Sequence, residues 1–141
     1  MVSYYRLIIS LIYMPEYNFT KFEGVGNKYE DRISITKSQF IGFPRVFCQT
    51  YGVKELTHAE LFFDNEKNAI AVRFHKEKVA DSYKVNYSAN PEGATISARS
   101  FFKSNHIDTN RVSGKYQAKV YEDPTLGTLY VIELASHEPT H

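Results

Sequence analysis

The segment 59–74 constrains the fold of this chain most, because it carries the sequence signature of a β-hairpin. Apolar residues alternate with other side chains in the runs 59–63 and 69–74, as in strands that bury one face. Between the runs lie Asp64, Asn65, Glu66, Lys67 and Asn68, which are residues typical of a turn. The pair Asp64 and Glu66 resembles a catalytic carboxylate pair, but its place in the turn favours turn chemistry.

Short strands and helices are predicted on both sides of this hairpin. Residues 32–37 alternate as a half-buried strand does, and 40–43 form a second apolar piece. Pro44 suits the first turn of a helix, so 44–51 is predicted as a short helix that Gly52 ends. Further along the chain we predict a strand over 83–88, a turn over 90–93, a strand over 94–98 and a helix over 100–105.

The second half of the chain repeats the order of the first. Residues 62–72 align without a gap on 121–131, which matches Asp64 with Asp123, Ile70 with Leu129 and Val72 with Val131. Arg45, Phe47 and Val53 match Arg99, Phe101 and Ile107 if 109–113 is an insertion. We therefore expect an α+β fold of mostly antiparallel strands. Two βαββ-like halves, 32–74 and 83–134, each with one short helix, would form a compact barrel-like sheet.

Length and composition indicate one domain that follows an N-terminal segment. The chain has 141 residues, 43% of them hydrophobic and 23% charged, as in ordinary folded proteins. We assign 1–31 to the N-terminal segment, 32–134 to the domain and 135–141 to a tail. The apolar run 7–14 is too short to span a bilayer as a helix. It is compatible with a secretory signal, an added edge strand or an upstream start before a native Met14, and the last is favoured.

The residues that most enzymes need are not arranged in known catalytic motifs here. No phosphate-binding loop, zinc-protease, nucleophile-elbow or calcium-loop pattern occurs. The lone Cys48 excludes an intrachain disulfide and a cysteine-based zinc cluster, and it is predicted as a core residue. His137 and His141 lie four apart, but on a tail that holds Pro139. We expect a cytoplasmic protein that is not an enzyme, with no cofactor, no metal and no membrane association.

A basic and aromatic segment points instead to nucleic-acid binding. The net charge is only +1, yet residues 73–103 hold six Lys or Arg against three acidic residues. On the predicted strand 83–88, Lys84 and Asn86 share one face and Tyr83, Val85 and Tyr87 the other. Cations neutralise phosphates and aromatic rings stack on bases. The candidate phosphate ligands are Arg73, Lys84, Arg99 and Lys103, and the candidate stacking residues are Tyr83 and Tyr87, which belong to the core if Val85 does.

Two family resemblances agree with nucleic-acid binding. The order from Arg32-Ile33-Ser34-Ile35-Thr36-Lys37 through the hairpin 59–74 resembles AbrB-type DNA-binding domains. That implies a βαββ barrel and a transcription regulator, although the basic residues that such regulators use are few here. Residues 59–106 can also be divided into four strands and a helix, and the last strand leads into the helix through Ala94-Thr95-Ile96-Ser97-Ala98-Arg99-Ser100-Phe101-Phe102-Lys103. This arrangement is similar to the PC4 and Whirly single-stranded-DNA-binding folds, whose last strand also runs through a serine-bearing turn into a helix.

We therefore expect a non-enzymatic protein that binds nucleic acid, single-stranded DNA or RNA with weak sequence preference, or acts as an AbrB-like regulator. The alternative is a protein-interaction or assembly module without a nucleic-acid role, which includes a homo-oligomer. Near-zero net charge and eleven tyrosines fit this alternative, because tyrosine is enriched at protein interfaces.

Overall fold

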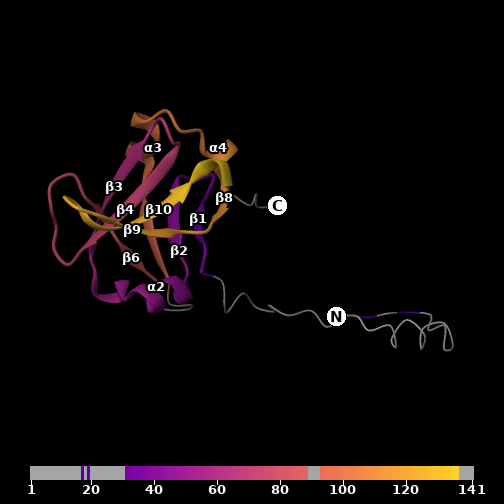
Figure 1. Ribbon diagram of the computed structural model, residues 1–141, viewed down its shortest axis with the longest axis horizontal. Coiled ribbons are helices and arrows are strands. Elements are labelled where there is room, and N and C mark those ends of the chain that lie inside the picture. The colour runs from indigo at the N-terminus through magenta and orange to yellow at the C-terminus, as the bar shows by residue number, and fades with distance from the viewer. Residues whose placement is uncertain (1–16, 18, 20–30, 89–92, 137–141) are drawn as a thin grey trace.

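Two five-stranded antiparallel sheets form the described part of the chain, residues 17, 19, 31–88 and 93–136 of the computed structural model (Figure 1). The first sheet has the order β6-β7-β2-β1-β8: Asn86–Tyr87, Ala94–Ser97, Phe40–Phe43, Ile33–Ile35 and Gly114–Tyr116. The second sheet has the order β5-β3-β4-β10-β9: Tyr83–Lys84, His58–Asp64, Ala69–His75, Gly127–Glu133 and Lys119–Asp123. The mostly antiparallel α+β class predicted from the sequence is confirmed.

Three short α-helices connect the strands in the described residues: α2 Arg45–Tyr51, α3 Arg99–Ser104 and α4 Thr109–Val112. Two 3₁₀ turns, Val53–Glu55 and Leu134–Ser136, follow α2 and β10. The predicted end of α2 is confirmed, since Gly52 has φ 63° and donates its N–H to the carbonyl of Cys48. A glycine adopts this left-handed conformation at little steric cost. Helix α2 lies at one end of the sheets, and α3 and α4 lie at the other (Figure 1).

One hydrophobic core lies between the two sheets. Ile41 and Ile96 on the first sheet and Ile70 and Val72 on the second are fully or almost fully buried in it. The rings of Phe43 and Phe74, one from each sheet, are 5.2 Å apart in an edge-to-face arrangement. Burial of these apolar side chains on both inner faces supplies the main driving force that holds the sheets together.

Both predicted hairpins form, and their turns begin with the same device. Asp64 accepts hydrogen bonds from the backbone N–H groups of Glu66 and Lys67, each 3.0 Å away. Asp123 accepts them from Thr125 and Leu126, at 2.8 and 2.9 Å. These bonds lower the pKa of the Asp123 carboxyl. The interpretation of Asp64 as a turn residue rather than a catalytic acid is consistent with these contacts.

The expected barrel-like closure is wrong, because the two sheets do not join into one. Among the described strands, the chain passes from one sheet to the other three times: between β2 and β3, between β5 and β6, and between β8 and β9. At each passage the hydrogen-bond ladder ends and a new one starts on the other sheet, so edge strands remain. The architecture is therefore two separate sheets around a shared core.

The prediction of one continuous strand over 83–88 is also wrong. Tyr83 pairs with Ala59 in the second sheet, whereas Tyr87 pairs with Ala94 in the first. Val85 lies between them, almost fully buried, and donates its N–H to the carbonyl of Thr57 over 2.8 Å. Burial of Val85 between the sheets thus separates the two tyrosines that the sequence placed on one strand face.

The gapless alignment of the two hairpins fails in their second strands. Asp64 pairs with Ala69, but Asp123 pairs with Gly127, so the second turn is one residue shorter. As a result Ile70 and Val72 point into the core opposite Ile132 and Tyr130, and the alternating Leu129 and Val131 lie on the other face. The internal duplication itself stays a prediction. Strands of the two predicted halves do lie side by side, since β2 pairs with β7 and β4 pairs with β10.

The structure corrects one further expectation, and several others fall on residues that it does not describe. The proposed insertion 109–113 contains helix α4, so the second half carries two helices rather than one. The apolar run 7–14, most of the turn 90–93 and the tail histidines lie outside the described residues.

Candidate functional site

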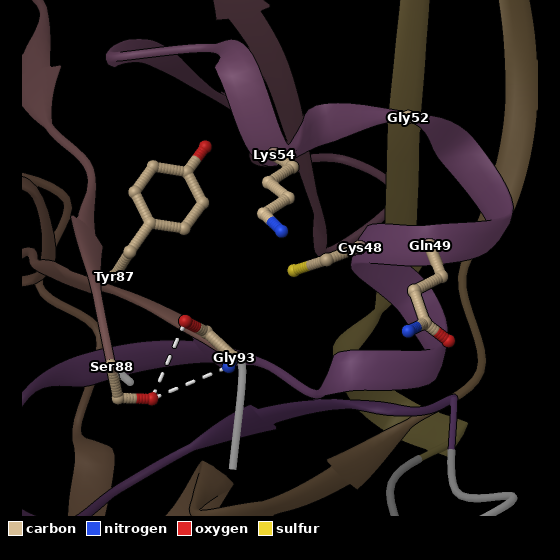
Figure 2. Close-up of a pocket in the computed structure, with 7 residues that line it drawn as sticks. All are labelled: Cys48, Gln49, Gly52, Lys54, Tyr87, Ser88 and Gly93. Carbon is tan, nitrogen blue, oxygen red and sulfur yellow. Dashed lines mark hydrogen bonds between the residues drawn. The ribbon is translucent and has the colours of Figure 1, made fainter. Parts of the chain in front are cut away.

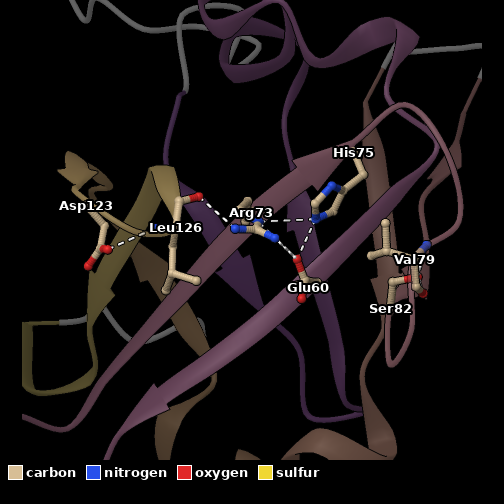
Figure 3. A network of polar contacts seen from close by, with 7 residues as sticks. All are labelled: Glu60, Arg73, His75, Val79, Ser82, Asp123 and Leu126. Atoms are coloured by element: carbon tan, nitrogen blue, oxygen red, sulfur yellow. Dashed lines mark hydrogen bonds and ion pairs between the residues drawn. The ribbon is translucent and has the colours of Figure 1, made fainter.

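Arg73, a predicted phosphate ligand, is held in a network on the outward face of the second sheet (Figure 3). We call outward the face of this sheet that points away from the core. The guanidinium donates to the Glu60 carboxylate from Nε at 2.9 Å and lies 2.7 Å from it through Nη2. Its Nη1 donates to the carbonyl of Leu126 over 2.8 Å. Arg73 therefore ties β3, β4 and the β9–β10 turn together.

His75 completes this network on the same face. Its Nε2 lies 2.5 Å from the same Glu60 oxygen, so this nitrogen carries the proton that it donates to the carboxylate. The Nε of Arg73, which lies 3.2 Å from His75 Nε2, then donates to Glu60 instead of to the ring. The three side chains are half-buried and satisfy one another, as a structural ion-pair cluster does. Within residues 31–88 and 93–136, no group of three His, Cys, Asp or Glu is placed to hold a metal ion.

The other predicted nucleic-acid ligands divide between two regions. Tyr83 on β5 places its phenol oxygen 2.7 Å from the hydroxyl oxygen of Ser100 on α3. Lys84, Arg99 and Lys103 are exposed on these same two elements, and Arg99 Nε donates to Gln39 over 3.2 Å. The hydrogen bond between Tyr83 and Ser100 joins β5 to α3. Four of the six predicted residues therefore lie on neighbouring segments. Arg73 and Tyr87 are used elsewhere.

Tyr87 lines a pocket of about 690 Å³ with Cys48, Gln49, Gly52, Lys54, Ser88 and Gly93 (Figure 2). Its hydroxyl donates to the carbonyls of Val53 and Leu56. Burial, and then the neighbouring Cys48, raise the pKa of Tyr87. The Cys48 thiol is buried and donates to the carbonyl of Phe43, and burial raises its pKa to about 11. A thiol in that state is a weak nucleophile, so this pocket does not suit cysteine catalysis.

A larger hollow of about 850 Å³ lies on the outward face of the second sheet. We call it the β4–β10 groove, after the strands that form its floor. Phe62, Ala71, Val131 and Lys119 lie directly opposite one another across β3, β4, β10 and β9. Because Ala71 has only a methyl group between the larger Phe62 and Val131, the middle of this row is recessed. The groove is also lined by Tyr121, Leu129, Asp64, Lys67, Asp123 and Glu133.

The groove opens onto β9, which is an edge strand of the second sheet. Val120 and Tyr121 are 49% and 52% exposed, and they are the most exposed large apolar side chains in residues 31–88 and 93–136. Lys119 Nζ lies 2.8 Å from the Glu133 carboxylate on β10, so a charged pair borders the groove beside them. Adjacent exposed apolar residues on a strand with one open edge are typical of a surface that binds protein.

Sequence reasoning missed this surface although it identified the hairpin that contains it. The order Lys119, Val120, Tyr121, Glu122, Asp123 has no clean alternation of apolar and polar residues. The absence of a strictly buried face is the local signal of a strand that stays exposed. Its edge position depends on the pairing of β10 with β4, which no local pattern specifies.

No family model, curated protein or solved structure matches this chain. No helix in the described ranges has the length and apolar character needed to cross a membrane.

Proposed function

We propose that this protein is a non-enzymatic protein-interaction module that binds an extended segment of protein along β9 and the β4–β10 groove. The observation that carries the proposal is the exposed pair Val120 and Tyr121 on an edge strand beside an apolar hollow. An edge strand presents unpaired backbone N–H and C=O groups, and an added strand satisfies them. The groove would then receive alternate side chains of that segment and supply selectivity.

The charge distribution supports a peptide ligand of mixed character. The apolar residues Phe62, Val131 and Tyr121 are bordered by Lys119 and Glu133 within the same groove. A polar rim around an apolar and aromatic centre is the usual composition of a protein-binding surface. The side chains of Glu60, Arg73 and His75 hydrogen-bond with one another on the same face, so their polar groups are already partnered. Val120 and Tyr121 at the open side of the groove are 49% and 52% exposed, and they are available to a ligand.

Selection of peptides from a phage-displayed library against the purified chain tests this function. Selected peptides are expected to slow hydrogen exchange of the backbone amides in Lys119–Asp123. Tyr121→Lys is expected to weaken their binding by about tenfold or more, because it removes a central aromatic contact. Tyr17→Lys is the matched control, since Tyr17 is 64% exposed and lies outside both sheets. Peptides that protect other amides, or that bind Tyr121→Lys normally, would contradict the proposal.

Nucleic-acid binding is the second candidate, and the contact between Tyr83 and Ser100 favours it. This contact places Lys84, Arg99 and Lys103 on adjoining segments, where their exposed charges can meet one phosphate backbone. Fluorescence anisotropy with labelled single- and double-stranded oligonucleotides across a salt series tests it. Replacing Lys84 and Lys103 by Ala is expected to reduce the salt slope for single strands by about 1.4, from about 0.7 for each phosphate contact. An unchanged slope, or no binding at low salt, would remove this candidate.

A further inference from the structure

The four edge strands of the two sheets differ in how much backbone they expose. Strands β5 and β6 have two residues each and β8 has three, whereas β9 has five. Very short edge strands offer little backbone to a partner, which is one way in which proteins avoid pairing between sheets. Strand β9 is therefore the edge in the described residues that is long enough to pair along its length.

The sequence of β9 is complementary to itself when it pairs antiparallel. If two copies extend one continuous sheet, residues that lie opposite each other must point to the same face. Lys119, Tyr121 and Asp123 share the face of the groove, since they alternate along the strand. A register centred on Tyr121 then places Lys119 of each copy opposite Asp123 of the other.

The neighbouring registers lack this complementarity. A shift that centres the pair on Glu122 places two Glu122 carboxylates opposite each other, and like charges in that position oppose pairing. A shift that centres it on Val120 leaves Lys119 opposite Tyr121, without a charged partner. The register centred on Tyr121 also places the two Tyr121 rings together, which is a favourable cross-strand pair.

We propose that a second copy of this chain occupies this surface, and that the two β9 strands pair antiparallel about a two-fold axis at Tyr121. This inference rests on the proposed function and names the partner of the same surface. The two second sheets become one ten-stranded sheet, and the two grooves join across the axis. Lys119 then lies between Glu133 of its own chain, 2.8 Å away, and Asp123 of the second copy. Every charge in the contact has an opposite charge beside it, except Glu122, which lies opposite Val120.

Sedimentation velocity of the full chain, freed of nucleic acid, tests the pairing across a dilution series. We expect a dimer that dissociates on dilution. Lys119→Asp turns both Lys119–Asp123 contacts of the dimer into pairs of facing carboxylates. It is therefore expected to raise the dissociation constant of the dimer by about tenfold or more. Lys84→Asp makes the same charge change on β5, the opposite edge of the same sheet, and it should leave the dimer unchanged.

A charge-swap pair identifies the contact directly. Lys119→Asp and Asp123→Lys are each expected to self-associate about tenfold or more weakly than the native chain, and an equal mixture of the two should form a heterodimer because both charged pairs are then restored. Asp123 also accepts two hydrogen bonds in its turn, so a thermal melt must first show that Asp123→Lys is folded. If it is not, the comparison of Lys119→Asp with Lys84→Asp decides, together with hydrogen exchange in Lys119–Asp123 at high and low concentration.

The possible results separate this inference from the function on which it rests. A chain that stays monomeric at every concentration overturns the dimer, and the function still stands if selected peptides protect the amides of β9. A dimer that Lys119→Asp leaves intact, or that protects no β9 amide, places the interface elsewhere and overturns the inference. A dimer that Lys119→Asp weakens and Lys84→Asp does not supports it.

Discussion

The phenol oxygen of Tyr83 lies 2.7 Å from the hydroxyl oxygen of Ser100, and this hydrogen bond joins the edge strand β5 to the first turn of α3. The two residues are seventeen apart in the sequence, so the bond connects segments that are distant along the chain. Tyr83 also packs its ring against the core. A residue that the sequence placed among base-stacking side chains thus contributes to the stability of the chain.

Tyr83→Phe is expected to lower the free energy of unfolding by about 0.5–1.5 kcal/mol, because it removes one hydrogen bond and keeps the ring. Ser100→Ala should have a similar effect, and the double variant should lose less than the sum. Urea unfolding of the three variants measures this coupling. Strictly additive losses would show that the hydrogen bond contributes nothing.

Arg73→Ala is expected to lower the free energy of unfolding by about 1–3 kcal/mol, since it leaves the half-buried Glu60 carboxylate without its main partner. It also frees the carbonyl of Leu126. Lys84→Ala, at an exposed position on the same sheet, is the control and should change stability by no more than about 0.5 kcal/mol. Equal effects of the two variants in urea unfolding would contradict a structural role for Arg73.

Gly52→Ala is expected to cost about 1 kcal/mol through backbone strain, because φ at this position is 63°. No atom outside Gly52 and its two chain neighbours lies within 4 Å of an added Cβ, so a clash with packed groups makes no contribution. Gly52→Asn should cost less, because asparagine adopts the left-handed conformation more readily than alanine. Thermal melts of the two variants test this order, and a reversed order would rule out strain as the cause.

The Cys48 thiol is expected to react slowly with iodoacetamide in the folded protein. Burial raises its pKa from an ordinary 9.0 to about 11. At about pH 8 this lowers the thiolate fraction by about a hundredfold, and the thiolate is the reacting form. Mass spectrometry of the alkylated protein measures the rate, and the same reaction in urea is the control. Equal rates with and without urea would contradict the burial of Cys48.

Stability is expected to decrease in alkaline solution. The pKa of Cys48 is higher in the folded chain than in the unfolded one, so its contribution is complete below pH 9.0 and is lost as the pH rises toward about 11. Burial also raises the pKa of Tyr116, which adds a loss that begins near pH 10.0. Urea unfolding at a series of pH values measures the slope, and Cys48→Ala should remove its earlier part. A flat profile above pH 9.0 would contradict both shifts.

Part of the candidate surface was predictable from the sequence, and its function was not. The second hairpin is visible through its match to the first, and Asp123 is visible as a turn residue. Whether Val120 and Tyr121 are covered depends on which strands flank β9. A single sequence carries no local signal for that pairing, because strands distant in the chain decide it.

The sequence by itself determined the local elements of this protein: the hairpin 59–74, the helix that ends at Gly52 and the turns that begin at Asp64 and Asp123. Each depends on side chains within a few residues, such as an aspartate that accepts nearby N–H groups or a glycine with positive φ. The tertiary structure decided which of these elements meet. It divided 83–88 between two sheets because Val85 is buried between them, paired Arg73 with Glu60 across two strands, and left β9 at an edge. Those outcomes follow from burial and from the pairing of strands that are distant in the sequence. The free energy of folding gained in this way depends on the whole core, and the order of neighbouring residues does not reveal it.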